Sequence, residues 1–118
     1  PKGGDKTVIG DCQQLRQAFA RASILSNEKY RGVRVALAEG EMKILANNPD
    51  QEEAEEVVAV EYSGEPIEMG FNVSYLIDVL STLRSKSVRI TLSDSSSSAL
   101  LEAEGVGDAL YVIMPMRL

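Results

Sequence analysis

The apolar residues in the first part of the chain switch from a strand-like run to helical spacing. Thr7–Ile9 predicts an edge strand, and Asp11, with Gln14 three residues later, has the arrangement that begins a helix. Spacing of three and four residues then places one apolar face on this helix, formed by Cys12, Leu15, Phe19 and Ala22. We expect the helix to end near Leu25–Asn27.

Three strands are predicted after this helix. Gly32–Ala38 alternates between apolar and polar positions, and a returning strand carries Met42, Ile44 and Ala46. Asn47–Asp50 contains two asparagines and a proline and interrupts the pattern. Glu53–Tyr62 then predicts a longer strand with one charged face.

The second half of the chain has the same order of predicted elements. Ile67–Phe71 predicts a strand, and Asn72 can cap a helix whose apolar face consists of Val73, Leu76, Leu80 and Leu83. Three further strands are expected at Val88–Ser93, Ser98–Ala103 and Leu110–Met114.

The two halves therefore repeat. The apolar positions of the second helix follow those of the first by 61 residues, and Val33–Leu37 is echoed by Val88–Leu92 in the pattern V-R-[V/I]-x-L. We predict a single α+β domain over residues 1–118, built from two β-α-β-β-β repeats at approximately 5–63 and 64–118. The two helices would pair and pack on antiparallel sheets.

Composition removes several classes of chemistry. The chain has no histidine and a single cysteine, Cys12, so it has no usual general base, no Ser-His or Cys-His pair and no internal disulfide. We expect no metal and no cofactor. No apolar run could span a bilayer and no signal peptide is present, so we expect a cytoplasmic protein. Because Pro1 rather than methionine begins the sequence, we expect a fragment or a processed product.

The net charge of −6 is distributed unevenly. Residues 1–34 carry seven Lys/Arg and three Asp/Glu, whereas residues 35–118 carry five and fifteen. A uniformly basic nucleic-acid binder does not have this pattern. It favours a protein with one basic and one acidic side.

The C-terminal segment is unusually apolar for a chain end. Val112, Ile113, Met114 and Met116 surround Pro115, which lacks an N–H and would stop further strand pairing. Methionine suits a surface that accepts varied partners, because its side chain adapts. The pattern alone leaves two interpretations open, a last core strand with a short tail or a binding surface.

Ile24 and Tyr75 lie off the apolar faces of their predicted helices. On a helical wheel Ile24 points about 160° away from the first apolar face, beside Arg21. An exposed isoleucine there predicts an interface, unless the helix has already ended and the chain turns it inward. Tyr75 is either a boundary tyrosine with a solvated hydroxyl or a contact residue.

Four stretches resemble a known family. They are Ile24–Gly32, Ala46–Glu56, Gly70–Tyr75 and Tyr111–Leu118. Together they are similar to the C-terminal domain of the bacterial beta sliding clamp, the beta subunit of DNA polymerase III, of the gammaproteobacterial type. The resemblance covers nearly the whole chain. It implies a DNA-clamp domain, one of three in a subunit, and a homodimeric ring around duplex DNA that has no enzymatic activity and gives the polymerase its processivity.

The resemblance implies a groove that receives short linear peptides of DNA polymerases, the clamp loader and mismatch-repair proteins. The matching positions are Tyr30, Asn72, Tyr75, Ser98, Val112, Ile113, Met114, Pro115, Met116, Arg117 and Leu118. Tyr30 stands where relatives can carry phenylalanine, which keeps the ring. The remainder of the groove is expected on the preceding domain, so this chain should bind such peptides more weakly than a complete clamp.

The resemblance also implies contacts with a second clamp subunit and with DNA. The subunit interface would use Arg21, Ile24, Leu25, Glu52, Glu53, Glu55 and Glu56. Apolar contact would supply affinity, and the charges would set register. Arg16, Arg84 and Lys86 are the candidates to meet phosphates of the encircled duplex, which is held without sequence preference. No membrane contact is implied.

Two other functional classes remain as alternatives. One is a generic protein-interaction domain without a role at DNA. The other is a small carboxylate-dependent enzyme using Asp78 and Asp94, although no spacing pairs these two residues. Asp78 also fits a polar helix face and Asp94 a turn.

Overall fold

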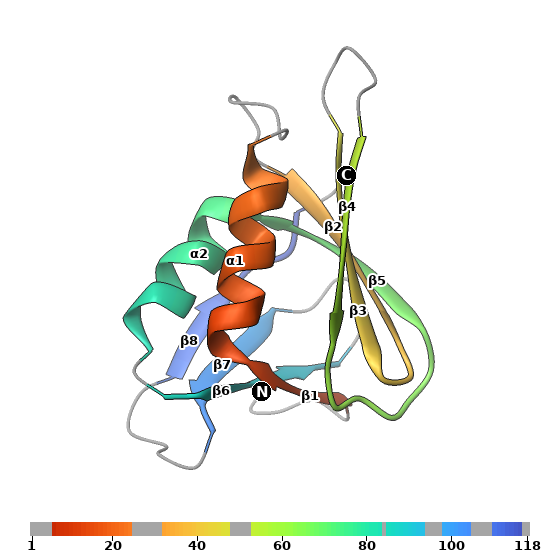
Figure 1. The fold of residues 1–118 in the computed structure, drawn as a ribbon. Helices are drawn as coiled ribbons and strands as arrows, with labels where there is room; N and C mark the ends of the chain where they lie inside the picture. The colour runs from red at the N-terminus through yellow and green to blue at the C-terminus, as the bar shows by residue number, and fades with distance from the viewer. Residues whose placement is uncertain are drawn as a thin grey trace.

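The chain folds as a β-α-β-β-β unit followed by a second unit of the same kind (Figure 1). The computed structural model describes residues 6–24, 32–47, 53–83, 85–93, 98–104 and 110–116. Its elements are β1 (Lys6–Asp11), α1 (Cys12–Ser23), β2 (Gly32–Ala38), β3 (Glu41–Asn47), β4 (Glu53–Ala59), β5 (Ile67–Asn72), α2 (Val73–Thr82), β6 (Ser87–Leu92), β7 (Ala99–Ala103) and β8 (Leu110–Ile113). The predicted α+β class and order of elements are confirmed.

Helix α1 begins as predicted and ends early. The Asp11 carboxylate accepts a hydrogen bond from the Gln14 backbone N–H at 2.9 Å, and the four predicted apolar positions are buried together with Ala18. The helix ends at Ser23, before the expected Leu25–Asn27. The Ser23 hydroxyl donates to the Ala20 carbonyl at 2.7 Å, a local bond that competes with continuation of the helix.

Helix α2 also begins at its predicted cap. The Asn72 side-chain oxygen accepts a hydrogen bond from the Ser74 N–H at 2.9 Å. Val73, Leu76 and Leu80 are buried, but the helix ends at Thr82, so the prediction that Leu83 continues the helical face is wrong. Leu83 has extended backbone angles and is half-buried, because the chain must turn within four residues to begin β6.

The sheets exchange strands between the repeats. Their strand orders are β1-β6-β7-β8 and β4-β3-β2-β5, with every neighbouring pair antiparallel. The first strand of each repeat therefore pairs with the other repeat: Val8 on β1 lies opposite Ile90 on β6, and Val33 on β2 lies opposite Phe71 on β5. Neither repeat holds a complete sheet of its own.

Two isolated bridges join the sheets to each other. Ile9 and Glu61 exchange backbone hydrogen bonds of 3.0 and 2.8 Å, and the Met116 N–H donates to the Gly70 carbonyl at 2.7 Å. Ile9 and Gly70 are 61 residues apart, the same offset as between the helices. The bridges lie on the outer edges of β1 and β5. In the described part of the chain no segment pairs with the outer edge of β4 or β8.

Several predicted strand ends shift in the structure. β1 is longer than the predicted Thr7–Ile9, although it is an edge strand as expected. The strand predicted over Glu53–Tyr62 ends at Ala59, because the chain leaves β3 there to bridge to β1 at Glu61. The last strand ends at Ile113 rather than Met114, one residue farther from Pro115.

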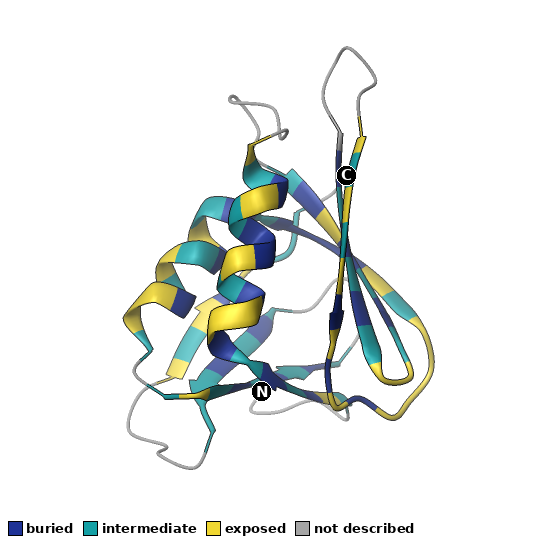
Figure 2. Cartoon of the chain, in the orientation of Figure 1, coloured by how far each residue is buried: buried dark blue, intermediate teal, exposed yellow. Residues whose placement is uncertain are grey.

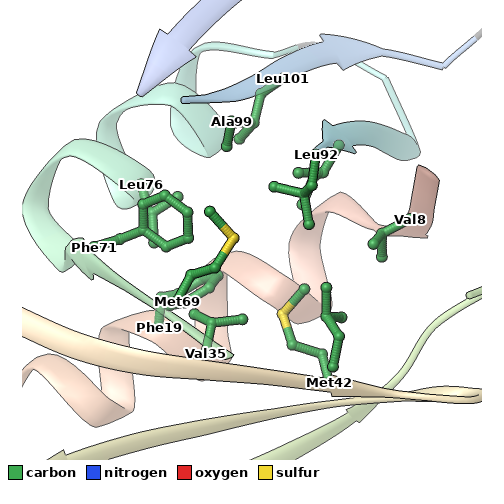
Figure 3. Close-up of a pocket in the computed structure, with 12 residues that line it drawn as sticks. Val8, Phe19, Val35, Met42, Met69, Phe71, Leu76, Leu92, Ala99 and Leu101 are labelled. Atoms are coloured by element: carbon green, nitrogen blue, oxygen red, sulfur yellow. The ribbon is translucent and has the colours of Figure 1, made fainter. Parts of the chain in front are cut away.

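Both sheets and both helices contribute to one hydrophobic core. Figure 2 shows buried positions on the helix sides that face the sheets and exposed positions on the opposite sides. A cavity of about 20 Å³ remains at the centre, lined only by apolar side chains, among them Phe19, Met42, Met69 and Leu101 (Figure 3). A water there would have no hydrogen-bond partner, so we expect the cavity to be dry.

Replacing Phe19 with alanine should lower the free energy of unfolding by about 3–5 kcal/mol, because Phe19 is almost fully buried between the sheets. Gln17→Ala, on the exposed side of the same helix, should change it by less than about 0.5 kcal/mol.

Because the repeats exchange strands, urea unfolding followed by circular dichroism and by tyrosine fluorescence should give one coincident transition. Two separated transitions would contradict the interdependence of the repeats.

Replacing Asn72 with alanine should destabilise the chain by about 1 kcal/mol, because the first turn of α2 loses the acceptor for the Ser74 N–H. Asn72→Asp keeps an oxygen at this position and should retain most of the stability. Thermal unfolding of both variants measures the difference. Equal losses would show that the side-chain oxygen is not what stabilises the helix start.

Candidate functional site

An exposed apolar row follows β8 at the edge of its sheet. Leu110, Val112 and Met114 are 53%, 58% and 68% exposed, whereas Tyr111 packs against the core and Ile113 is buried within it. This is the alternation of a strand with one face on the core. The row is unusual because large side chains, rather than polar ones, occupy the outward positions.

The neighbouring strand β7 borders this row. Leu100 lies opposite Val112, and Glu102 lies opposite Leu110. Ser98 immediately precedes β7, and its hydroxyl donates a hydrogen bond of 3.0 Å to the Met114 sulfur. We refer to Leu100, Leu110, Val112 and Met114 as the β8 strip.

The segment after β8 crosses to the other sheet. Pro115 and Met116 are half-buried, and the Met116 N–H is bonded to Gly70 on β5. Because Gly70 lies just before α2, this bridge brings Met116 beside the start of that helix, where Asn72 and Tyr75 lie. Helix α2 also contacts β8. Tyr75 is 60% exposed, as its position off the apolar face predicts.

The structure thus gathers most of the described peptide-site residues around one end of α2 and the edge of β8. Ile113 differs from its neighbours: its side chain is buried in the core, because it occupies an inward position of the strand. The Asn72 side chain is already used as the helix cap. Tyr30, Arg117 and Leu118 lie outside the described residues. The sequence prediction did not include Leu110 or Leu100. Leu110 could have been found, because it lies two residues before Val112 and so points to the same face of the strand.

A second surface lies where the end of α1 meets β4. Arg21 forms an ion pair with Glu56, with Nε and Nη2 at 3.0 and 2.9 Å from Oε1. The hydrogen bond to Glu56 raises the pKa of Arg21. Ile24 follows the helix and is 84% exposed, so the alternative in which it turns inward is wrong. Leu25 and Glu52 lie outside the described residues.

The open edge strand β4 continues this surface. Glu53, Glu55 and Val57 are exposed, while Glu56 and Val58 occupy the alternate, more buried positions. Val57 is 54% exposed and was not singled out from the sequence. The arrangement is an acidic edge with one large exposed apolar side chain, joined to the end of α1 by the ion pair between Arg21 and Glu56.

The structure describes two of the three basic residues that were predicted to meet DNA. Arg16 is half-buried on α1. Lys86 is exposed and follows the last residue of α2 by four positions. Its carbonyl accepts the Cys12 N–H at 2.7 Å, which places Lys86 beside the start of α1. Arg84 lies outside the described residues.

The described part of the chain was compared with the residues that metal or carboxylate chemistry would need. It contains no group of three or more Cys, Asp or Glu side chains able to hold a metal ion. Asp78 is exposed on α2, and Asp94 lies outside the described residues. Cys12 is buried, its thiol donates to the Leu80 carbonyl at 3.4 Å, and burial raises the pKa of the thiol. Neither described helix has the length and apolarity needed to cross a membrane.

Comparison with known proteins gives a consistent match. The family model described as "DNA polymerase III beta subunit, C-terminal domain" matches residues 1–117. The beta sliding clamp of Pseudomonas putida KT2440 is 63% identical over the whole chain, and that of Escherichia coli K12 is 56% identical. The chain spans 32% of the length of each of these relatives.

Solved structures match equally well. A sliding clamp from Pseudomonas aeruginosa, crystallised with a ligand, is 62% identical and superposes with a TM-score of 0.98. A clamp from Bartonella birtlesii bound to griselimycin is 37% identical, with a TM-score of 0.95. Both matches cover the entire chain and 32% of the solved chain. The two-sheet, two-helix arrangement, the sequence and the family model agree: the chain belongs to the family of C-terminal domains of the DNA polymerase III beta subunit, the beta sliding clamp.

Proposed function

We propose that the chain acts as the peptide-docking domain of a cytoplasmic sliding clamp and has no catalytic role. Its ligands would be short linear peptides of DNA polymerases, the clamp loader and mismatch-repair proteins. The observation that carries the proposal is the exposed apolar row of Leu110, Val112 and Met114 on the open edge of a sheet. A soluble domain rarely exposes adjacent large apolar side chains without a partner for them.

The chemistry of this surface suits varied apolar peptides. The Met114 side chain is flexible and polarisable, so it adapts to different ligand side chains. Tyr75 offers a rigid ring with a hydroxyl that can stay solvated. Since the Met116 N–H is bonded to β5, the backbone between β8 and Met116 is held in place before a ligand arrives, which lowers the entropic cost of binding.

We further propose that β4 and Ile24 form the ring interface with a second clamp subunit. This is supported by the open edge of β4, its exposed Val57 and the neighbouring Ile24. The apolar side chains would supply affinity, and Glu53 and Glu55 would disfavour pairing of β4 with another β4. Arg21 and Glu56, which pair within the chain, would hold α1 against β4 and so position Ile24.

In such a ring, duplex DNA would be held loosely by a few cationic side chains. Arg16 and Lys86 are the described candidates, and both lie near the start of α1. Few phosphate contacts mean weak, salt-sensitive binding without sequence preference, which suits a protein that must move along DNA.

Val112→Ala should weaken binding of a fluorescent peptide that carries a clamp-binding motif by about fivefold, because two buried methyl groups are lost from the contact. Val57→Ala is the matched control, since Val57 has similar exposure on the other sheet, and it should change the affinity by less than about twofold. Fluorescence anisotropy measures both. Deleting Met116–Leu118 should abolish binding. Equal effects of the two valine substitutions would contradict the proposed site.

Ile24→Ala combined with Leu25→Ala, introduced into the full-length subunit that contains this chain, should convert dimers to monomers. The reason is that the exposed apolar contact at the end of α1 would be lost. Sedimentation velocity reports the change in mass, and Val112→Ala in the same subunit should leave the dimer intact. An unchanged dimer in the double variant would rule out this interface.

A further inference from the structure

We propose that Leu100, Leu110 and Glu102 form a second contact of the peptide site, which selects an apolar residue accompanied by a basic residue. This inference rests on the proposed peptide-docking function and adds a specificity to it. Neither leucine nor Glu102 belongs to the set that the sequence indicated. The contact is defined by their positions on the outward face of β7 and β8.

The geometry of β8 suits an extended ligand. Side chains two residues apart on a strand are separated by about 7 Å, so Leu110 and Met114 lie roughly 13 Å apart along the strand. An extended peptide has the same period and can place alternate side chains against Met114, Val112 and Leu110 in turn. Leu100, opposite Val112, widens the row to two strands. The apolar surface therefore begins at Met114, which accepts the hydrogen bond from Ser98, and continues along the strand to Leu110.

Glu102 gives the far end of this strip a negative charge. It lies opposite Leu110 on β8 and opposite Arg89 on β6. Arg89, however, is bound through two nitrogens to Glu104, at 2.9 and 3.2 Å. Within the described residues Glu102 therefore has no cationic partner. A carboxylate beside the exposed Leu110 and the half-buried Leu100 favours a ligand that carries Lys or Arg next to an apolar side chain.

A second copy of the chain fits this surface less well than a peptide. Two copies that met on this face would each bring a Glu102 that has no cationic partner among the described residues, and neither copy would supply a described cation to pair with it. A short basic peptide supplies that charge. The side-chain spacing of β8 matches that of an extended peptide, and Glu102 favours a basic residue in it. We therefore assign the strip to a linear peptide.

The test uses fluorescein-labelled peptides that carry the same clamp-binding motif with different three-residue extensions. The extensions are Leu-Ser-Lys, Leu-Ser-Glu and Ser-Ser-Lys, each placed at the N-terminal end in one peptide and at the C-terminal end in another. Affinities are measured by anisotropy at low ionic strength, where exposed charges are least screened. At one of the two ends, Leu-Ser-Lys should bind about fivefold tighter than Ser-Ser-Lys and about threefold tighter than Leu-Ser-Glu.

Variants of the chain identify the contact. Glu102→Lys should reverse the preference between the Lys and Glu extensions, and Leu110→Ser should remove the advantage of the leucine. Glu39→Lys, an equal charge change in the exposed turn between β2 and β3 of the other sheet, should alter neither. Circular dichroism confirms that each variant is folded, which is expected because all three positions are at least partly exposed.

The outcomes separate this inference from the proposed function. If the unextended motif binds but all three extensions bind alike at both ends, the second contact is wrong and the docking site stands. The same conclusion follows if Glu102→Lys changes no preference. If the unextended motif does not bind at all, the proposed function fails. Light scattering could instead show a dimer that Leu110→Ser dissociates, while all the extended peptides bind with the same affinity. That result would assign the strip to a second copy of the chain and overturn the inference.

Discussion

The exchange of first strands between the two repeats determines the rest of this structure. β1 leaves the first repeat to pair with β6, and β5 leaves the second to pair with β2. Each sheet is therefore completed by the other half of the chain, and the helices pack over both. Burial of one shared core, rather than of two small ones, lets a chain of this length bury 26 hydrophobic residues in a single cluster within its described part.

The same exchange decides which strand edges remain open. The two exchanged strands lie at sheet edges, and each is closed in part by an isolated bridge, one through Glu61 and one through Met116. The last strands of the repeats, β4 and β8, keep their outer edges unpaired among the described residues. Open edges invite pairing or docking unless charge protects them. β4 carries glutamates, whereas β8 has none, so the two edges suit different partners.

Local patterns in the sequence predicted local structure well. The cap at Asp11, the buried face of α1 and the exposure of Ile24 and Tyr75 follow from helical periodicity, which needs only neighbouring residues. The strand exchange could not be predicted in this way, because pairing between β1 and β6 joins residues about 80 positions apart and leaves no local signature. Leu83 was wrongly assigned to the helical face, because α2 ends where the chain turns towards β6 and not where helix propensity falls.

The candidate site, like the fold, could be predicted from the sequence only in part. Family resemblance indicated the tail, but only strand alternation distinguishes outward Val112 and Met114 from buried Ile113, and only the register places Glu102 beside Leu110. Hydrogen exchange measured by mass spectrometry, with and without a clamp-binding peptide, would locate the docking surface. A peptide docked along β8 should protect residues 110–116 and the start of α2 and leave β4 unchanged. Protection confined to β2, β3 or β4, with none at β8, would contradict this placement.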